Sequence, residues 1–389
     1  MKKFVYILFL TSCLMFAGCD DGKSGDVYGS ADEYEDGSSE TVDNDSNKNE
    51  RPDEAPRPGG GGGNGNGNSN GSNGSGDSDS EIPDDENDDS DNENSGGNES
   101  IYALEPDVAS CSSGIPTDAE KQKVLARLNY IRSIHGLPAV VYNSEGDEIT
   151  AECSLIIAAN NIDGGTLQLE HEPPKSWECW SQEAYDGCKS SNIHVAWAKN
   201  KDLSETDSTT IVDAFMVDQN VDSLGHRRWF LDPWLGHISF GRADYTNGSG
   251  NSVIGSAIKV IHDDKPDVSN LKIDFIAYPF ENYPKELYPD SSTKMSFSVL
   301  KDKLNKFGNA TNINLDAATI AIIDSTNNKT MAVSGLKTEV GTANSIIGVP
   351  NQISWLVSGI KTGTKYNVTI SNVLINNAST DYQYWFELK

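Results

Sequence analysis

Histidine is the residue type in this sequence best suited to chemistry, and two of the six histidines have distinctive surroundings. His171 lies in the acidic, proline-rich run 169–174, and His226 begins a basic run with Arg227 and Arg228. An imidazole titrates near neutral pH, so it can serve as a general base or bind a divalent metal. The plainer alternatives are an exposed loop histidine at 171 and a histidine that fixes a turn at 226.

No nucleophile stands out in the sequence. Ser190 and Ser191 could act with His226, but a serine nucleophile needs a base and a third group that orients the base. The chain has no Gly-x-Ser-x-Gly elbow, and the pattern of a lone reactive cysteine is absent. The sequence therefore leans away from an enzyme and leaves the question open.

Four cysteines beyond the N-terminal region predict disulfides. They are Cys111, Cys153, Cys179 and Cys188, an even number, which in an exported chain indicates two bridges and allows three connectivities. The short loop between Cys179 and Cys188 favours that pair and leaves Cys111 for Cys153. A zinc site is the competing interpretation, but no Cys-x-x-Cys pair is present.

The first residues predict export and attachment to a membrane. Lys2 and Lys3 precede an apolar run, 4–16, which has the length of a signal-peptide core and is too short to span a bilayer. The following Phe16-Ala17-Gly18-Cys19 resembles the lipobox of bacterial lipoproteins. That resemblance implies cleavage after residue 18 and acylation of Cys19, which makes the membrane a partner. An ordinary secretory signal followed by a chance cysteine is the alternative.

A long acidic segment follows the signal sequence. Residues 20–100 hold 24 Asp or Glu and four Lys or Arg, and the whole chain has a formal net charge of −29. With almost no aliphatic side chains, this segment cannot offset its ordering entropy, so we expect a disordered acidic linker. Weak cation binding by residues 77–93 is the alternative, although the acids lack a regular ligand spacing. The acidity argues against a nucleic-acid partner.

The first half of the head predicts helices followed by strands. Thr117 and Glu120 form a capping box, and the apolar residues after them recur at helical spacing. Two more helices are expected over 144–160 and 209–220. The stretch 175–192 is interpreted as a disulfide-stapled loop. Short strands are expected at 238–242, 256–261 and 274–278, so the helices should pack on an antiparallel sheet.

Five short motifs occur in a recognisable order. They are Asn129-x-x-Arg132, the lone His171, Ser190-Ser191-Asn192-Ile193, Gly225-His226-Arg227-Arg228-Trp229 and Ile238-Ser239-Phe240-Gly241. Over residues 115–282 they resemble the CAP superfamily, which includes cysteine-rich secretory and pathogenesis-related proteins, in its bacterial SCP-like form. The resemblance implies an α/β/α sandwich with an open cleft.

The resemblance also implies roles for single residues. In that family two histidines and two acidic residues converge in the cleft and can hold a divalent metal such as zinc. His171 and His226 match the histidines, and Asp218 stands where the third helix offers an acid, although a solvated helix carboxylate is the plainer interpretation. Ser191 replaces the second acid, which weakens both a zinc site and a hydrolytic site. His194 is a candidate replacement ligand.

Other residues near these motifs could support the cleft. Asn192 and Arg227 directly adjoin the matched positions. Trp177, Trp180 and Trp229 could line a ligand groove, since aromatic rings offer large contact areas, but core packing is their commoner use.

The C-terminal hundred residues have the pattern of a β-sandwich. Residues 366–370 alternate by two, as a half-buried strand should, and turn residues separate the strand-like runs. Their pattern resembles an immunoglobulin-like or fibronectin-like module, which implies no chemistry. The expected strands are 295–300, 319–323, 330–333, 352–357, 366–373 and 382–388.

Together these features predict an α+β protein with two head domains. The expected parts are a signal peptide (1–18), an acidic tether (19–104), a CAP domain (105–285) and a β-sandwich (286–389). The expected function is extracellular binding of a small lipid, peptide or surface-protein ligand in the CAP cleft, on a protein lipid-anchored to the bacterial outer membrane or cell surface. A metal-assisted or Ser/His hydrolase and a structural adhesin are the alternatives.

Overall fold

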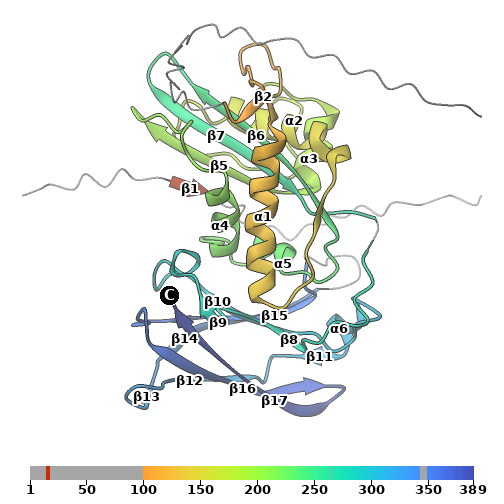
Figure 1. Cartoon of the computed structure of the whole chain (residues 1–389), viewed down its shortest axis with the longest axis vertical. Coiled ribbons are helices and arrows are strands. Elements are labelled where there is room, and N and C mark those ends of the chain that lie inside the picture. Colours follow the sequence, from red (N-terminus) through yellow and green to blue (C-terminus); the bar gives the residue numbers. More distant parts are fainter. Residues whose placement is uncertain (1–14, 18–99, 264, 342–347) are drawn as a thin grey trace, which may run out of the picture. The chain divides into compact units, whose positions relative to one another are not determined.

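The computed structural model describes residues 100–263, 265–341 and 348–389, together with the backbone of Met15–Ala17. Apart from that backbone, the expected signal peptide, the acidic linker up to residue 99 and the acylated Cys19 lie outside the described residues. The described part is mixed α+β, with helices and strands in its first half and a largely β C-terminal part (Figure 1). None of the helices in the described part of the chain combines the length and the hydropathy that a membrane span requires.

The first helix forms where the capping box predicts it. Helix α1 spans Asp118–Ile134, and the Thr117 side chain accepts a hydrogen bond from the Glu120 amide at 3.3 Å. Its buried residues Val124, Leu128 and Ile131 make one apolar face against the sheet. A short 3₁₀ turn, η1 (Ser144–Gly146), then leads into helix α2 (Asp147–Ala159).

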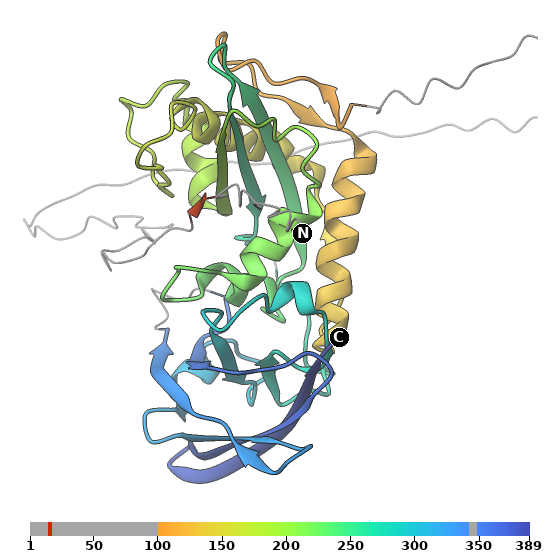
Figure 2. The same ribbon diagram turned by 90° about the vertical axis from the view of Figure 1, so that its left-hand side faces the viewer.

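A five-stranded sheet lies between two layers of helices. Its order is β1-β5-β7-β6-β4, and all neighbours are antiparallel except β4 and β6. Figure 2 shows α1 (orange) on one side of the strands and the yellow-green helices on the other. Two glycines allow α2 to approach the sheet, because a Cβ on Gly241 or Gly255 would lie 2.2 Å from an α2 backbone atom. The strands are β1 (Met15–Ala17), β4 (Val141–Tyr142), β5 (Ser191–Lys199), β6 (His237–Thr246) and β7 (Asn251–Lys259).

The sequence predicted a loop over 175–192, but the structure has a helix there. Helix α3 (Gln182–Lys189) begins at Ser181, whose hydroxyl accepts from the Ala184 amide at 2.9 Å. It packs on α2 so closely that a Cβ on Gly187 would lie 1.9 Å from the Ile149 carbonyl oxygen. Packing on α2 therefore stabilises a short helix whose own sequence is mostly polar.

The disulfide pairing differs from the expected one. Cys111 bonds Cys179 and Cys153 bonds Cys188, so the predicted pairs 179–188 and 111–153 are wrong. The reason is the contact between α2 and α3, which places Cys188 against Cys153 inside the protein. Cys179 lies before α3, beside the turn at Val108 that carries Cys111.

This connectivity can be tested by peptide mapping. Proteolysis of the unreduced protein should release one linked pair that contains Cys111 and Cys179 and another that contains Cys153 and Cys188. Mass spectrometry before and after reduction would identify both pairs. A linked peptide joining Cys179 to Cys188 would contradict the α2–α3 packing described above.

The C-terminal part consists of two sheets whose strands are mostly antiparallel. One has the order β14-β15-β10-β8, and the other runs β13-β12-β16-β17-β9 with β11 paired to β16. The strands are β8 (Phe275–Tyr278), β9 (Glu281–Tyr283), β10 (Met295–Val299), β11 (Ile313–Asn314), β12 (Thr319–Asp324), β13 (Lys329–Thr330), β14 (Val333–Val340), β15 (Asn351–Val357), β16 (Lys365–Ile375) and β17 (Ala378–Leu388). Small elements complete the fold: β2 (Tyr102–Leu104), β3 (Ile115–Pro116), α6 (Gly308–Thr311) and η2 (Lys285–Leu287).

The first sheet ends and the C-terminal sheets begin before residue 285, the expected boundary between the two head domains. Strand β8, which was expected to close the first sheet, pairs instead with β10, and β9 pairs with β17. One hydrophobic cluster also contains residues from both parts of the head: Leu128 and Phe230 belong to the same core as Phe297. The two halves of the head therefore share a core within one compact unit.

Candidate functional site

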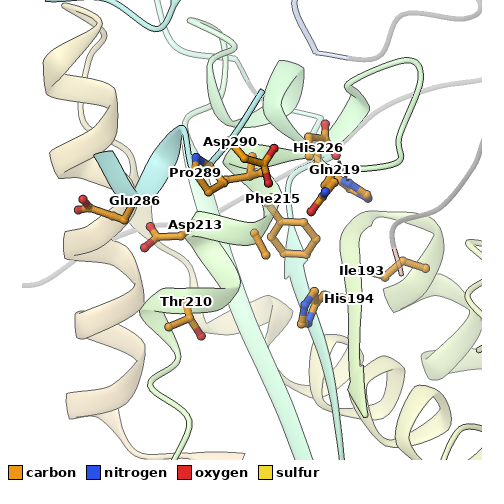
Figure 3. Close-up of a pocket in the computed structure, with 13 residues that line it drawn as sticks. Ile193, His194, Thr210, Asp213, Phe215, Gln219, His226, Glu286, Pro289 and Asp290 are labelled. Atoms are coloured by element: carbon orange, nitrogen blue, oxygen red, sulfur yellow. Dashed lines mark hydrogen bonds and ion pairs between the residues drawn. The ribbon is translucent and has the colours of Figure 1, made fainter. Parts of the chain in front are cut away.

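A cavity of about 310 Å³ lies between helix α4 (Thr209–Val217), the start of β5 and the segment that contains η2 (Figure 3). Its apolar wall comes from Ile193, Ala214, Phe215, Val217 and Pro289. Its polar wall comes from His194, Thr210, Asp213, Asp218, Gln219, His226, Glu286 and Asp290. Because residues 286–290 follow β8 and β9, both halves of the head contribute to this site.

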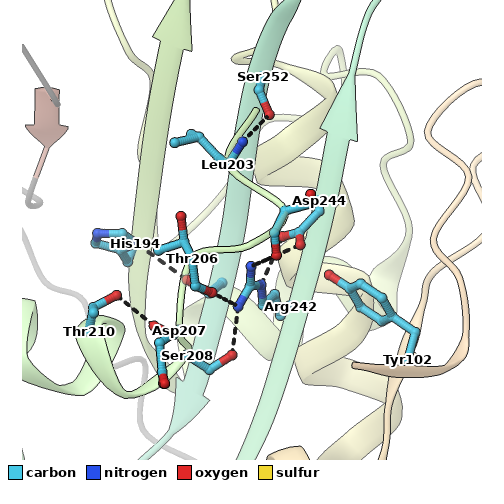
Figure 4. Close-up of polar contacts among 12 residues, drawn as sticks. Tyr102, His194, Leu203, Thr206, Asp207, Ser208, Thr210, Arg242, Asp244 and Ser252 are labelled. Atoms are coloured by element: carbon cyan, nitrogen blue, oxygen red, sulfur yellow. Dashed lines mark hydrogen bonds and ion pairs between the residues drawn. The ribbon is translucent and has the colours of Figure 1, made fainter. Parts of the chain in front are cut away.

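A buried arginine of the sheet fixes the start of α4 (Figure 4). The Arg242 guanidinium on β6 donates to the Thr206 carbonyl and the Ser208 hydroxyl, both at 2.7 Å. Asp244 binds the same guanidinium at 2.8 and 2.9 Å. The loop before α4 is thereby attached to the sheet, and this sets the position of the cavity wall.

Asp218 and His226 form a buried pair at the other end of α4. Asp218 ends the helix in a left-handed conformation (φ 53°), and its carboxylate accepts from His226 Nδ1 at 2.8 Å. The second carboxylate oxygen accepts from the Arg227 amide at 3.1 Å. Asp218 is buried, so the interpretation as a solvated helix carboxylate is wrong. It orients His226, which lies in helix α5 (Gly225–Phe230).

The structure brings His171 and His226 together. Their ring centroids are 6.5 Å apart, and His171 Nδ1 lies 3.0 Å from the Cys188 carbonyl oxygen. Each Nδ1 thus faces an oxygen acceptor, so a hydrogen bond at either ring requires a proton on that Nδ1.

The pair does not fit a directly shared metal ion as it stands. Zinc binds ring nitrogens at about 2.0–2.1 Å, so two imidazoles on one tetrahedral zinc would have centroids about 5 Å apart. The observed separation is 6.5 Å. Within the part of the chain that the structure describes, no group of three or more His, Cys, Asp or Glu side chains is placed to hold an ion. His171 therefore lies beside His226, but it does not line the cavity.

Strand β5 sends its predicted site residues to opposite faces. Asn192 donates to the His226 carbonyl at 3.1 Å, and His194 lines the cavity edge-on to Phe215, 5.9 Å between centroids. Side chains alternate along a strand, so Ser191 faces the α2 and α3 layer. Its buried Oγ has no hydrogen-bond partner among the described residues. The structure therefore does not pair Ser191 with His226 as nucleophile and base.

Burial controls the charge of His194. It lowers the pKa of this imidazole to about 3, and the nearby His226 and Arg242 act in the same direction. His194 is consequently neutral at physiological pH and offers the cavity a polar group without charge.

Arg227 connects the cavity to the C-terminal sheets. Its guanidinium donates to the Met216 and Val217 carbonyls at 2.7 Å each, at the end of α4. It also donates to the Lys294 carbonyl at 2.8 Å and lies 3.6 Å from the Tyr278 ring centroid. Arg227 thus acts on the cleft through the helix end and the backbone bond to Asp218, without lining the cavity.

The cavity is bordered by more carboxylates than the sequence motifs indicated. Asp213 forms a two-pronged pair with Arg127 at 2.7 and 3.0 Å, and Glu286 accepts from the same guanidinium at 3.2 Å. Burial raises the pKa of Asp213 despite Arg127, whereas the Ser292 hydroxyl and amide lower the pKa of Asp290. With Asp218, four carboxylates border the site, while Arg127 pairs with two of them and Lys285 lies near Asp290.

Sequence reasoning missed the residues that shape this wall. Asp213 and Phe215 lie on a helix that was predicted, but nothing in its pattern marked them as cavity residues. Glu286 and Asp290 were assigned to a separate domain, so no signal connected them to the cleft. The three candidate tryptophans, Trp177, Trp180 and Trp229, pack against hydrophobic clusters and do not line this cavity.

No protein-family model matches the chain, and no curated protein matches it. The geometry of the cavity and the histidine pair is accordingly the basis for a function.

Proposed function

We propose that the head is an exported binding module of the CAP type, whose cleft receives a small ligand with an apolar body. The cavity beside α4 is the observation that carries this proposal. Its size is at the lower end of the usual range for small-molecule sites, and it combines an apolar wall with few polar groups, as such sites do. The ordered motifs and the His171–His226 approach support the CAP assignment.

The compartment follows from the cysteines. Two disulfides in the described head indicate an oxidising environment outside the cytoplasm. Attachment through an acylated Cys19 to the outer membrane or cell surface belongs to the proposal, because it depends on the lipobox-like sequence alone.

Filling the cavity should weaken binding. Ala214 lines it from α4, and Ala214→Trp would occupy the space without removing any core side chain. We expect the uncharged fluorescent probe N-phenyl-1-naphthylamine to bind the parent protein saturably and the variant at least tenfold more weakly. Fluorescence titration measures both.

The matched control is Ala126→Trp, which makes the same change on an exposed position of α1. It should leave the affinity for the probe within twofold of the parent value. Equal binding by the Ala214→Trp variant would remove the cavity from consideration, and absence of binding by the parent would favour the structural adhesin.

The Asp218–His226 pair favours a second candidate, hydrolysis with His226 as general base. An imidazole oriented by a buried carboxylate is the arrangement that activates a nucleophile or water. Release of peptides from casein by the purified protein, lost in His226→Ala and kept in Ser191→Ala, would support this candidate over simple binding. Tight zinc binding lost in His171→Ala with His226→Ala would support its metal-assisted form.

A further inference from the structure

Strand β5 has one edge that is only partly covered. Along its full length, from Ser191 to Lys199, it pairs with β7 on one side. On the other side, within the part of the chain that the structure describes, it pairs with β1 alone, over Val195–Trp197 (Figure 1). Backbone N–H and C=O groups at such an edge are a template for another extended chain.

The strand that covers this edge belongs to the expected signal peptide. Met15–Ala17 pairs antiparallel with β5, with Ala17 opposite Val195. Cleavage after residue 18, as the lipobox-like sequence predicts, separates this strand from the processed protein. The backbone of β5 at Val195–Trp197 then loses the strand that pairs with it.

The same edge leads into the cavity. In the β1 register, the next position along a bound strand lies opposite His194, which lines the cavity. Directly opposed residues of an antiparallel pair place their side chains on the same face of the sheet. The side chain opposite His194 would therefore point to the face that carries Phe215 and the cavity.

The charge at the cavity determines which side chain fits. Asp213, Glu286 and Asp290 border it; Arg127 is bonded to the first two, Lys285 lies near Asp290, and the carboxylates still outnumber these two cations. A lysine or arginine has an apolar stem that suits the Phe215 wall and a cationic end that suits these carboxylates. An acidic side chain would meet repulsion there.

We infer that the β5 edge and the cavity form one peptide-binding site, in which an extended segment extends the sheet and inserts a basic side chain beside His194. This inference rests on the proposed function, because it names the ligand class of the same cavity.

A short peptide in the β1 register tests the inference. The probe is fluorescein-labelled Met-Phe-Ala-Lys-Ala-amide, which places lysine opposite His194, and the protein is the processed chain that begins at Cys19. Fluorescence anisotropy should show saturable binding. Replacing the lysine with glutamate should weaken it at least tenfold, and Glu286→Gln with Asp290→Asn should reduce that difference to below threefold. The exposed α3 carboxylate provides the control, Glu183→Gln, which should change nothing.

Backbone methylation tests the edge itself. In an antiparallel pair only alternate residues direct their amides to the partner strand. Two peptides N-methylated on alternate amides should therefore differ, one binding at least tenfold more weakly than the other. An uncleaved Cys19→Ala chain, which keeps Met15–Ala17 attached, should also bind the peptide at least tenfold more weakly than the processed chain.

The outcomes separate this inference from the proposed function. If both methylated peptides bind equally well, or glutamate replaces lysine without loss, the inference is wrong. If the peptide fails while N-phenyl-1-naphthylamine still binds in a manner sensitive to Ala214→Trp, the inference falls and the proposed function stands. If neither probe binds, both are wrong.

Discussion

Arg227→Met should destabilise the protein by about 3–5 kcal/mol, because it removes the donor from three carbonyls and each buried acceptor left unpaired costs about 1–3 kcal/mol. The guanidinium is fully buried and donates to carbonyls of both α4 and the segment before β10. Its removal would leave those buried acceptors without a donor, and each such loss is costly. Chemical denaturation, followed by circular dichroism, should show a lower midpoint for unfolding.

The loss should extend to function, because Arg227 stabilises the end of α4 where Asp218 orients His226. Lys123→Met is the control: it removes a charge from a half-exposed pair with Asp207, and such pairs contribute at most about 1 kcal/mol. Arg227→Lys should recover only part of the stability, since an ammonium cannot span carbonyls on both sides. A cost below 1 kcal/mol for Arg227→Met would show that the two halves of the head do not depend on this residue.

Acidification from pH 7 to pH 5 should destabilise the head strongly through two buried histidines. Burial lowers the pKa of His135 to about 3, with Arg227 and Arg132 acting in the same direction and a backbone bond to Ala277 opposing them. Burial likewise lowers the pKa of His194 to about 3. Both imidazoles are therefore neutral in the folded protein and take up protons when it unfolds.

The direction of the pH effect follows from proton uptake. Between about pH 6.5 and pH 3 the unfolded chain binds a proton at each position and the folded protein does not, so the free energy of unfolding falls as the pH falls. At pH 5 the expected loss is about 2 kcal/mol for each histidine. Above pH 7 these two groups should contribute no further change.

Comparison with a variant isolates the imidazoles from the carboxylates. His135→Phe keeps an aromatic ring beside Phe280 and Tyr283 and removes one titrating group. Between pH 4.5 and pH 6 the slope of unfolding free energy against pH should be lower by about 1.4 kcal/mol per pH unit than in the parent. Identical slopes would mean that His135 is accessible to protons in the folded state.

Local sequence signals were sufficient for several elements. The capping box at Thr117 and the apolar spacing after it place α1, because a helix terminus and one buried face are properties of neighbouring residues. Alternation over 366–370 predicts β16, and the structure extends that strand to Lys365–Ile375. Mixed α+β composition with a largely β C-terminal part was likewise predictable from the order of such segments.

Contacts between distant segments decided the features that were mispredicted. Helix α3 packs on α2. The same contact brings Cys188 to Cys153, and these two cysteines form a disulfide. Strand β8 pairs with β10 in a C-terminal sheet, so β7 is the last strand of the first sheet along the chain. A strand pattern indicates which face is buried but does not identify the neighbouring strand, since pairing depends on the whole sheet.

For the site, the sequence by itself determined the candidate residue types and their order along the chain. Only the tertiary structure placed the ring centroids of His171 and His226 6.5 Å apart and directed Ser191 away from them. It also placed Glu286 and Asp290 in the cavity wall. The physical reason is that a cavity is enclosed by side chains from separate elements, and its shape and charge arise from their packing. The spacing of residues along the sequence specifies neither the shape nor the charge of the cavity.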